Sequence, residues 1–514
     1  MKTNAMHRAG IVPALMTACA LIVAAGAQAQ DREREPAPAG PQTALTHGLR
    51  PNLLKIGEPL PRWSLQARMA HHRVPGVAIA VLKDGQVVQA MGFGVRQAGT
   101  QEAVDADTLF SVGSISKIAT AATSLRLVAD GRLDLDRDVN GYLRAWQVAS
   151  LPGVANAPVT LRMLMSHTAG LTVHGFKDFL PGEPLPTLPE ILDGTSPAKN
   201  NPIRLQHAPG LKVDYSGGGT MVQQRMIEDV AGQPLEAVAR AQVFDPLDMH
   251  RSTFLSPLPA ERGNIARAHD RDGAPTALPR GWQAFPEQAA SGLWTSANEL
   301  GAFVGALIQS YHGADGLLPQ PIARQMMTEV APSPHGLGPR LEGAGATRIF
   351  HHGGANDSYH AWIEGYLETG DGFVILTNGA NGYALHREIR NALSDAIGLG
   401  VNPLVRTVDL DLNAPIYADY AGVYRLDPAA PMDHRGGLAD SFDADTVEVA
   451  IDDGAMRIRL PDQDEPRTLQ PLSPTRFAAT TATQYEFHRD AHGKVRALSV
   501  EQGSSRAYYR RTPE

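Results

Sequence analysis

The sequence predicts an α/β domain whose sheet is built from both ends of the chain, followed by a small antiparallel β domain. Strand-like runs stand at residues 77–82 and 87–91, helical patterns fill the middle, and strand-like runs return at 361–366 and 373–377. After about residue 403 the pattern changes to short strand-like runs separated by turns, at residues 420–424, 446–451, 456–460, 477–480, 484–488 and 498–502. With 514 residues, the chain is also too long for one ordinary domain.

Composition and charge narrow the class of protein. Hydrophobic residues make up 43% of the chain and charged residues 19%, which is the balance of a soluble globular protein with a sizeable core. The formal charge is −8 and no long basic run occurs. Because phosphate binding needs clustered Lys and Arg, nucleic acid is not expected as a partner.

The first 29 residues have the pattern of a cleavable signal peptide. Lys2 and Arg8 supply positive charge, residues 11–25 are apolar, and Ala27 and Ala29 are small residues at a cleavage site. The apolar stretch is shorter than the roughly 20 residues that a membrane span needs. We therefore expect a secreted or periplasmic protein without a stable membrane span. Cys19, the only cysteine, would be removed with the signal.

Residues 30–60 are rich in Pro, Ala, Gly and charge, so they are predicted to be a flexible lead-in. The α/β domain is expected over residues 61–402 and the β domain over residues 403–514. Within the α/β domain, Asp84-Gly85 predicts a hairpin turn. Apolar residues on one face predict a helix over residues 115–130, which Gly131 ends, and another helix ends at Gly232.

Ser114 and Lys117 form the first candidate site. A serine hydroxyl is a weak nucleophile unless a base lies beside it, and a buried lysine with a lowered pKa can be that base. Ser114 opens the predicted helix, so Lys117 lies one turn further on the same face, and the free N–H groups of the helix end suit an oxyanion. The alternatives are an N-cap serine and a solvated lysine. Ser196 and Lys199 repeat the spacing, but they lie in a Pro- and Asn-rich loop.

Two further segments could complete a site. Tyr215 stands on a glycine-rich turn before a helix, where its phenol could relay a proton, although a surface tyrosine fits the same pattern. His352 precedes Gly353, Gly354 and Ala355 at a strand, where a histidine could donate hydrogen bonds or carry charge. His174 could border the cleft, but we interpret it as an ordinary loop histidine.

The sequence lacks the motifs of metal sites, of α/β-hydrolases and of nucleotide-binding proteins. No HExxH-like spacing occurs and the other histidines are scattered, so no metal site is expected. The sequence has no Gly-x-Ser-x-Gly, no P-loop, and no Gly-x-Gly-x-x-Gly between a strand and a helix. We expect no cofactor.

Together, the motifs at Ser114, Tyr215 and His352 resemble those of the serine β-lactamase and penicillin-binding protein family. The likeness is closest to the branch that holds class C β-lactamases, D-Ala-D-Ala carboxypeptidases and related esterases, and it covers residues 64–395. It implies a β-lactamase/transpeptidase-like fold, with an antiparallel sheet flanked by a helical region. The tail from Tyr420 resembles the small β domain that often follows such hydrolases. Residues 110–113, 164–171 and 291–297 also fit the family.

The resemblance also implies roles. Ser114 would be the nucleophile, Lys117 its base partner and Tyr215 the proton shuttle. His352 and Gly354 would form the third motif, and the oxyanion hole would be the backbone N–H groups of Ser114 and Ala355. Two positions depart from the family: Gly217 replaces the Asn of Tyr-x-Asn, and His352 replaces the Lys of Lys-Thr-Gly. Both favour an esterase or D-peptidase over an efficient β-lactamase.

Two functions follow from these residues. The first is a serine hydrolase that forms an acyl-enzyme with an ester, a D-amino-acid amide or peptide, or a β-lactam. The alternative is a non-catalytic penicillin- or peptidoglycan-binding protein. It is considered because Gly217 replaces the Asn of the family's Tyr-x-Asn motif. The residues determine neither the substrate nor the oligomeric state.

Overall fold

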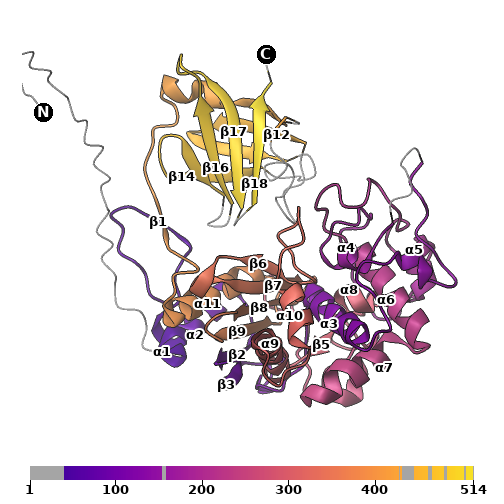
Figure 1. The fold of residues 1–514 in the computed structure, drawn as a ribbon. Helices are drawn as coiled ribbons and strands as arrows, with labels where there is room; N and C mark the ends of the chain where they lie inside the picture. Colours follow the sequence, from indigo (N-terminus) through magenta and orange to yellow (C-terminus); the bar gives the residue numbers. More distant parts are fainter. Residues whose placement is uncertain are drawn as a thin grey trace, which may run out of the picture. The chain divides into compact units, whose positions relative to one another are not determined.

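A six-stranded antiparallel sheet lies at the centre of the first domain (Figure 1). The computed structural model describes residues 40–152, 158–427, 429–430, 445–460, 466–479, 483–502 and 505–512. The strand order is β3-β2-β9-β8-β7-β6. The first two strands come from the start of the domain and the other four from its end, so the predicted sheet from both chain ends is confirmed. The strands are β2 (Gly76–Lys83), β3 (Gln86–Gly94), β6 (Arg340–Glu342), β7 (Ile349–Ala355), β8 (His360–Tyr366) and β9 (Gly372–Thr377).

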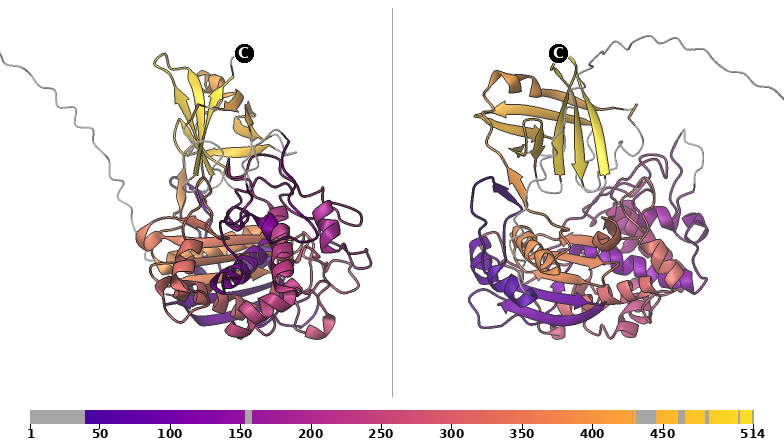
Figure 2. Two further views of the ribbon diagram at one scale, coloured as in Figure 1. Left: turned by 45° about the vertical axis from the view of Figure 1, so that its right-hand side comes forward. Right: turned by 60° about the vertical axis from the view of Figure 1, so that its left-hand side comes forward.

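Both faces of the sheet are covered, and β2 shows this most clearly. Because side chains alternate along a strand, Val77 and Ile79 enter one core while Ala78 and Ala80 enter the other. The first core contains residues of α1 (Pro41–His47), α2 (Leu65–His72) and α11 (Gly382–Ile397). The second core contains residues of α9 (Ala297–His312) and of the helical region (Figure 2).

The segment before the sheet differs from its prediction. Residues 1–29, the predicted signal peptide, lie outside the described residues. Of the predicted flexible lead-in, residues 41–55 contain α1 and β1 (Leu53–Lys55), which pairs with β10 (Val405–Thr407). Leu45 packs in the core beneath α11, and Arg50 donates two hydrogen bonds of 2.6 Å to the Asp395 carboxylate. The prediction was wrong for residues 41–55, because an amino-acid composition rich in Pro, Ala, Gly and charge gives no sign of the contacts that these residues make in the folded chain.

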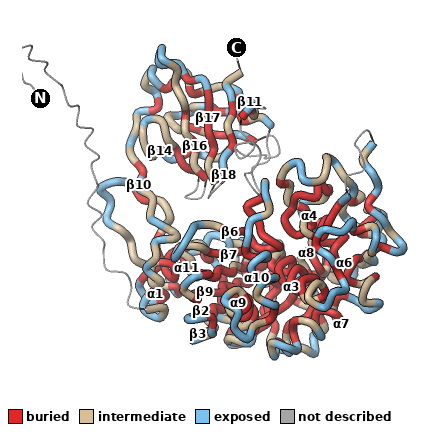
Figure 3. The backbone as a smooth tube through the Cα atoms, viewed as in Figure 1, coloured by how far each residue is buried: buried red, intermediate tan, exposed pale blue. Residues whose placement is uncertain are grey.

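A helical region surrounds α3 (Ser116–Ala129). In this helix 11 of 14 residues are buried, so it is a central helix and not the one-faced helix that its pattern predicts (Figure 3). It contacts α6 (Gly217–Ala231), α7 (Leu235–Ala239) and α8 (Gln288–Ser291). The region also holds α4 (Leu161–Met165), α5 (Leu188–Asp193), α10 (Gln320–Met326) and the short pair β4 (Phe110–Ser111) and β5 (Trp294–Thr295). No helix in the described ranges has both the length and the apolar character needed to cross a bilayer.

The C-terminal strands form a closed antiparallel barrel, in which β18 pairs back with β11. In β12 the residues Val447 and Val449 are buried while their neighbours are not, as expected for a barrel with a filled interior. The predicted antiparallel β domain is confirmed, although β14 and β18 were not predicted. The strands are β11 (Gly422–Leu426), β12 (Thr446–Asp452), β13 (Ala455–Arg459), β14 (Arg467–Pro471), β15 (Arg476–Ala478), β16 (Thr483–Arg489), β17 (Val495–Gln502) and β18 (Ser505–Arg511).

Candidate active site

Ser114 lies in a tight turn between β4 and α3. The turn is a 3-10 turn over Gly113–Ile115, and α3 begins two residues after Ser114, whose side chain does not cap the helix. The hydroxyl of Ser116 donates to the Gly113 carbonyl (2.6 Å) and accepts from the Leu293 N–H (2.9 Å). These bonds fix the turn and leave Ser114 partly exposed at the head of the helix.

Lys117 places its amine beside the Ser114 hydroxyl. The distance from Lys117 Nζ to Ser114 Oγ is 3.1 Å, and Nζ also donates to the Ala290 carbonyl of α8 (2.8 Å). The residue is only 6% exposed. The alternative of a solvated lysine is therefore excluded, and the amine is held at hydrogen-bond distance from a hydroxyl that could act as a nucleophile.

Tyr215 reaches the same place from a distant loop. Its ring centroid lies 5.1 Å from Lys117 Nζ. The residues on each side fix its backbone: the Asp214 N–H donates to the His167 carbonyl (2.8 Å), and the Ser216 hydroxyl donates to the Thr172 carbonyl (2.8 Å) and accepts from Gly219 N–H at the start of α6 (2.9 Å). The tyrosine is thus held at the site and is no ordinary surface residue.

Several histidines surround Tyr215. Its ring centroid lies 4.2 Å from that of His167, 4.9 Å from that of His174 and 6.3 Å from that of His352. His335 also lies in this group, with its ring 4.9 Å from His167 and 6.3 Å from His352. The interpretation of His174 as an ordinary loop histidine was wrong. No motif marked His335, because only the fold brings its loop to the site.

The end of β7 supplies the third motif. His352 is 6% exposed on the side of the strand that faces Tyr215. His351 points to the opposite face, where it stacks on Trp362 and lies 3.3 Å from Glu342. Burial alone would raise the pKa of Glu342, but the adjacent His351 and Arg340 hold it well below its usual value. Strand alternation therefore assigns only the second histidine to the site.

Two backbone segments meet beside Ser114. A Cβ on Gly113, whose φ is 48°, would lie 2.7 Å from the Ala355 nitrogen. A Cβ on Gly354 would lie 1.9 Å from the Val112 carbonyl oxygen and 3.2 Å from the Ser114 nitrogen. The Asn356 side chain donates to the Ser111 hydroxyl (2.6 Å) and ties the segments together. The backbone segments that carry the N–H groups of Ser114 and Ala355 therefore lie side by side.

The Gly354→Ala variant is expected to separate these segments. The new methyl group would collide with backbone atoms, so we expect a loss of about 10²-fold in kcat/KM for p-nitrophenyl acetate and a destabilisation of roughly 1–3 kcal/mol. The control is Gly353→Ala, whose Cβ would meet the Trp362 ring at 3.3 Å and the Ala361 carbonyl oxygen at an ordinary contact distance of 3.9 Å. Steady-state kinetics and thermal unfolding of both variants measure this, and equal effects in the two would contradict the assignment of Gly354.

Gly217 explains one departure from the family pattern. A Cβ at this position would lie 2.9 Å from the Phe176 ring and 3.1 Å from the His174 carbonyl oxygen. The space into which an asparagine side chain would project is therefore filled by residues of the loop between α4 and α5. An amide side chain at position 217 would collide with this loop, so the position does not offer an empty space for one.

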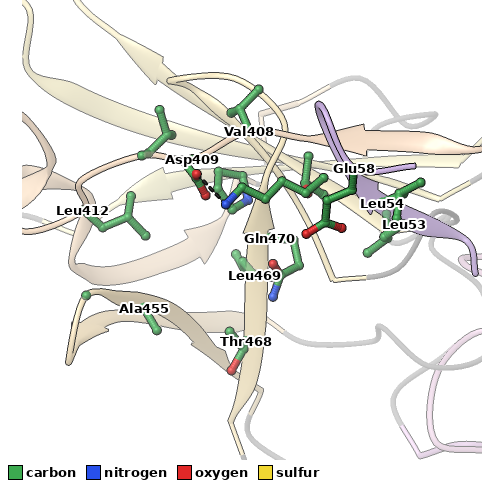
Figure 4. A pocket seen from close by; sticks show the side chains of 15 residues that line it. Leu53, Leu54, Glu58, Val408, Asp409, Leu412, Ala455, Thr468, Leu469 and Gln470 are labelled. Carbon is green, nitrogen blue, oxygen red and sulfur yellow. Dashed lines mark ion pairs between the residues drawn. The ribbon is translucent and has the colours of Figure 1, made fainter. Parts of the chain in front are cut away.

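A separate pocket lies away from these residues (Figure 4). It is lined by β1, Glu58, residues 407–410, Leu412, the turn between β12 and β13, and β14. In it Lys55 forms an ion pair of 2.5 Å with Asp409. None of the predicted site residues lines it. The chemistry predicted from sequence therefore belongs to the Ser114 cluster and not to this pocket.

Comparisons with known proteins agree with this geometry. The family model described as Beta-lactamase matches residues 64–396. Penicillin-binding protein 4 of Amycolatopsis lactamdurans is 31% identical over 229 residues, which are 43% of this chain and 56% of that protein. Esterase EstB of Burkholderia gladioli is 30% identical over 269 residues, 49% of this chain and 65% of that protein. The matches thus span between about half and two thirds of these relatives.

A solved structure extends the likeness in fold to most of the chain. The octameric penicillin-binding protein homologue from Pyrococcus abyssi aligns with a TM-score of 0.56 at 19% identity, and the alignment covers 87% of this chain and 98% of that one. At this identity the comparison shows the fold alone.

Proposed function

Because the chain belongs to the β-lactamase family of serine hydrolases, we propose that it hydrolyses its substrate through an acyl-enzyme on Ser114. The observation that carries the proposal is the 3.1 Å contact between Lys117 Nζ and Ser114 Oγ in a buried setting. A hydroxyl with a base at this distance can become a nucleophile at neutral pH.

In acylation, Ser114 Oγ forms a bond to the substrate carbonyl carbon and gives its proton to the Lys117 amine. The oxyanion accepts hydrogen bonds from the N–H groups of Ser114 and Ala355. As the bond to the leaving group breaks, Tyr215 passes its proton to that group and takes up the proton held by Lys117. Water next attacks the ester at Ser114, the acyl–Oγ bond breaks, and one proton of the water passes to Ser114 Oγ through Lys117 and Tyr215. The acid is released and the enzyme returns to its starting state.

The proposed substrate is an ester or a D-amino-acid amide or peptide, with β-lactams turned over less efficiently. Two features support this. No amide side chain stands at Gly217 to bond a substrate amide, and the third motif offers His352 in place of a permanently charged lysine. A histidine is a weaker partner for a substrate carboxylate than a permanently charged lysine, because it carries its charge only when protonated.

We also propose that the protein is secreted or periplasmic. The support is the amino-terminal pattern of Lys2, Arg8, the apolar residues 11–25 and the small residues before position 30. The proposed domain limits are residues 61–402 for the hydrolase domain and 403–514 for the β domain.

A substrate panel tests the proposal. The full chain is incubated with p-nitrophenyl acetate, nitrocefin and a peptide that ends in D-Ala-D-Ala, with turnover and intact mass followed together. We expect turnover of the ester and an acyl adduct on tryptic peptide 97–117, which holds Ser114. Binding of these compounds without any turnover would favour the non-catalytic binding protein, and turnover with the adduct on another residue would refute the role of Ser114.

A further inference from the structure

An acidic group lies next to the site, at the turn after β7. Asp357, two residues beyond Ala355, donates its backbone N–H to the Asp178 carboxylate (3.0 Å). Two residues of chain span at most about 7 Å, so Asp178 is held close to the proposed oxyanion hole. This carboxylate has no part in the steps proposed above.

Glu287 is a second acid in this group, and it is only 2% exposed. It immediately precedes α8, the helix whose Ala290 carbonyl accepts from Lys117. Among the hydrogen bonds of the described residues, its carboxylate accepts none from any other residue. A buried carboxylate with so few partners is costly to ionise, which points to a missing ligand.

Gln283 adds a buried acceptor to the same group. It is 2% exposed, and its Nε2 lies 3.4 Å from the hydroxyl of Ser358, the neighbour of Asp357. Its Oε1 is buried and has no hydrogen-bond partner within the described part of the chain. An amide oxygen left in this state can accept from a donor on a ligand.

The charges of the group are unbalanced. Its cation, Lys199, pairs with Glu183 (2.7 Å) and donates to the Asp178 backbone carbonyl (2.9 Å). Burial and the charge of Asp357 raise the pKa of Asp178 to about 7, and burial and the charge of Asp178 raise the pKa of Glu287 to about 8. The charge of Lys199 lowers both pKa values, but it offsets only part of the effect of burial and of the neighbouring carboxylates.

We infer that Asp178, Glu287 and Gln283 bind the ammonium group of the substrate and thereby select acyl donors with a free amine within a few bonds of the reacting carbonyl. This inference rests on the proposed function, because it places the amine relative to the acyl group on Ser114. All three side chains offer acceptors to a cationic donor. No three acidic, histidine or cysteine side chains of the described residues are placed to hold a metal ion together, so an organic ammonium is the better fit.

The test compares two inhibitors of p-nitrophenyl acetate hydrolysis at pH 7: D-alaninamide, which carries an ammonium, and N-acetyl-D-alaninamide, which does not. We expect the cationic amide to bind the wild-type protein at least tenfold more tightly. In Glu287→Gln this ratio should fall to about one. Because glutamine has the shape of the protonated acid, the variant should fold, and Asp178→Asn is a second variant with the same expected result.

The control is Glu261→Gln, which makes the same charge change at an exposed position and should keep the tenfold ratio. A wild-type ratio within twofold, or a tenfold ratio retained in both Glu287→Gln and Asp178→Asn, would overturn the inference. Absence of Ser114-dependent ester turnover would instead refute the proposed function, and calorimetry with the same two amides would then measure the ratio directly.

Discussion

Replacing Ser114 with alanine should abolish acylation and lower kcat/KM for p-nitrophenyl acetate by roughly 10⁴-fold or more. The hydroxyl is the group of the site that would form the covalent intermediate, while the oxyanion hole and the neighbouring side chains remain to bind substrate. The variant should fold normally, since Ser114 is partly exposed and the bonds that hold its turn come from Ser116. Turnover and labelling by a fluorophosphonate probe measure the effect.

The matched control is Ser196→Ala. Ser196 has the same spacing to Lys199 as Ser114 has to Lys117, but Lys199 is held by Glu183 and the Asp178 carbonyl. The control variant should retain labelling and turnover within about twofold, because its serine lacks a base. Undiminished labelling in Ser114→Ala would end the assignment of the nucleophile.

The local part of the site could be predicted from sequence because it depends on one helical turn. Ser114 and Lys117 are three residues apart, and a helix that follows the serine brings the two side chains together wherever it lies. Tyr215 and His352 are far away in sequence, so only the likeness to a known family could join them. His335 was marked neither by helical spacing nor by the likeness to a family, since its place at the site depends on how a loop packs.

Burial and charge balance are likewise properties of the fold. Glu287 and Gln283 belong to no motif in the sequence, yet each is 2% exposed in the folded chain. For α3 the sequence pattern led to the opposite error, because it predicted an exposed polar face where the residues are buried. Its small polar residues, such as Thr120 and Ser124, satisfy their hydroxyls within the core, so a polar residue did not mark an exposed face.

Strand β18 was not predicted because one of its two faces carries polar side chains. In β18 alternate residues face the barrel interior, and Ala507 and Tyr509 are buried there. Their neighbours Arg506 and Arg510 form ion pairs outside, with Glu501 and Asp427. A strand with one polar face carries a weaker signal than β2, which is buried on both faces.

The second large effect is expected for Lys117→Met, which should slow acylation by about 10³-fold and leave Ser114 unlabelled on the timescale of the wild type. Methionine has nearly the length of lysine and is apolar, so it should fill the buried space without loss of stability. The loss would then reflect the missing amine and not a disturbed fold. Stopped-flow acylation rates and thermal unfolding of the variant measure the two quantities.

Lys117→Arg separates a base from a mere positive charge. A guanidinium stays protonated throughout the pH range of such assays, so it could stabilise charge but could not accept the proton of Ser114. If the amine is the base, the arginine variant should be as impaired as the methionine variant, and small primary amines should partly restore acylation in Lys117→Ala by entering the vacated space. Arginine activity within tenfold of the wild type would instead make Lys117 an electrostatic group, and another residue beside Tyr215 would have to take the proton.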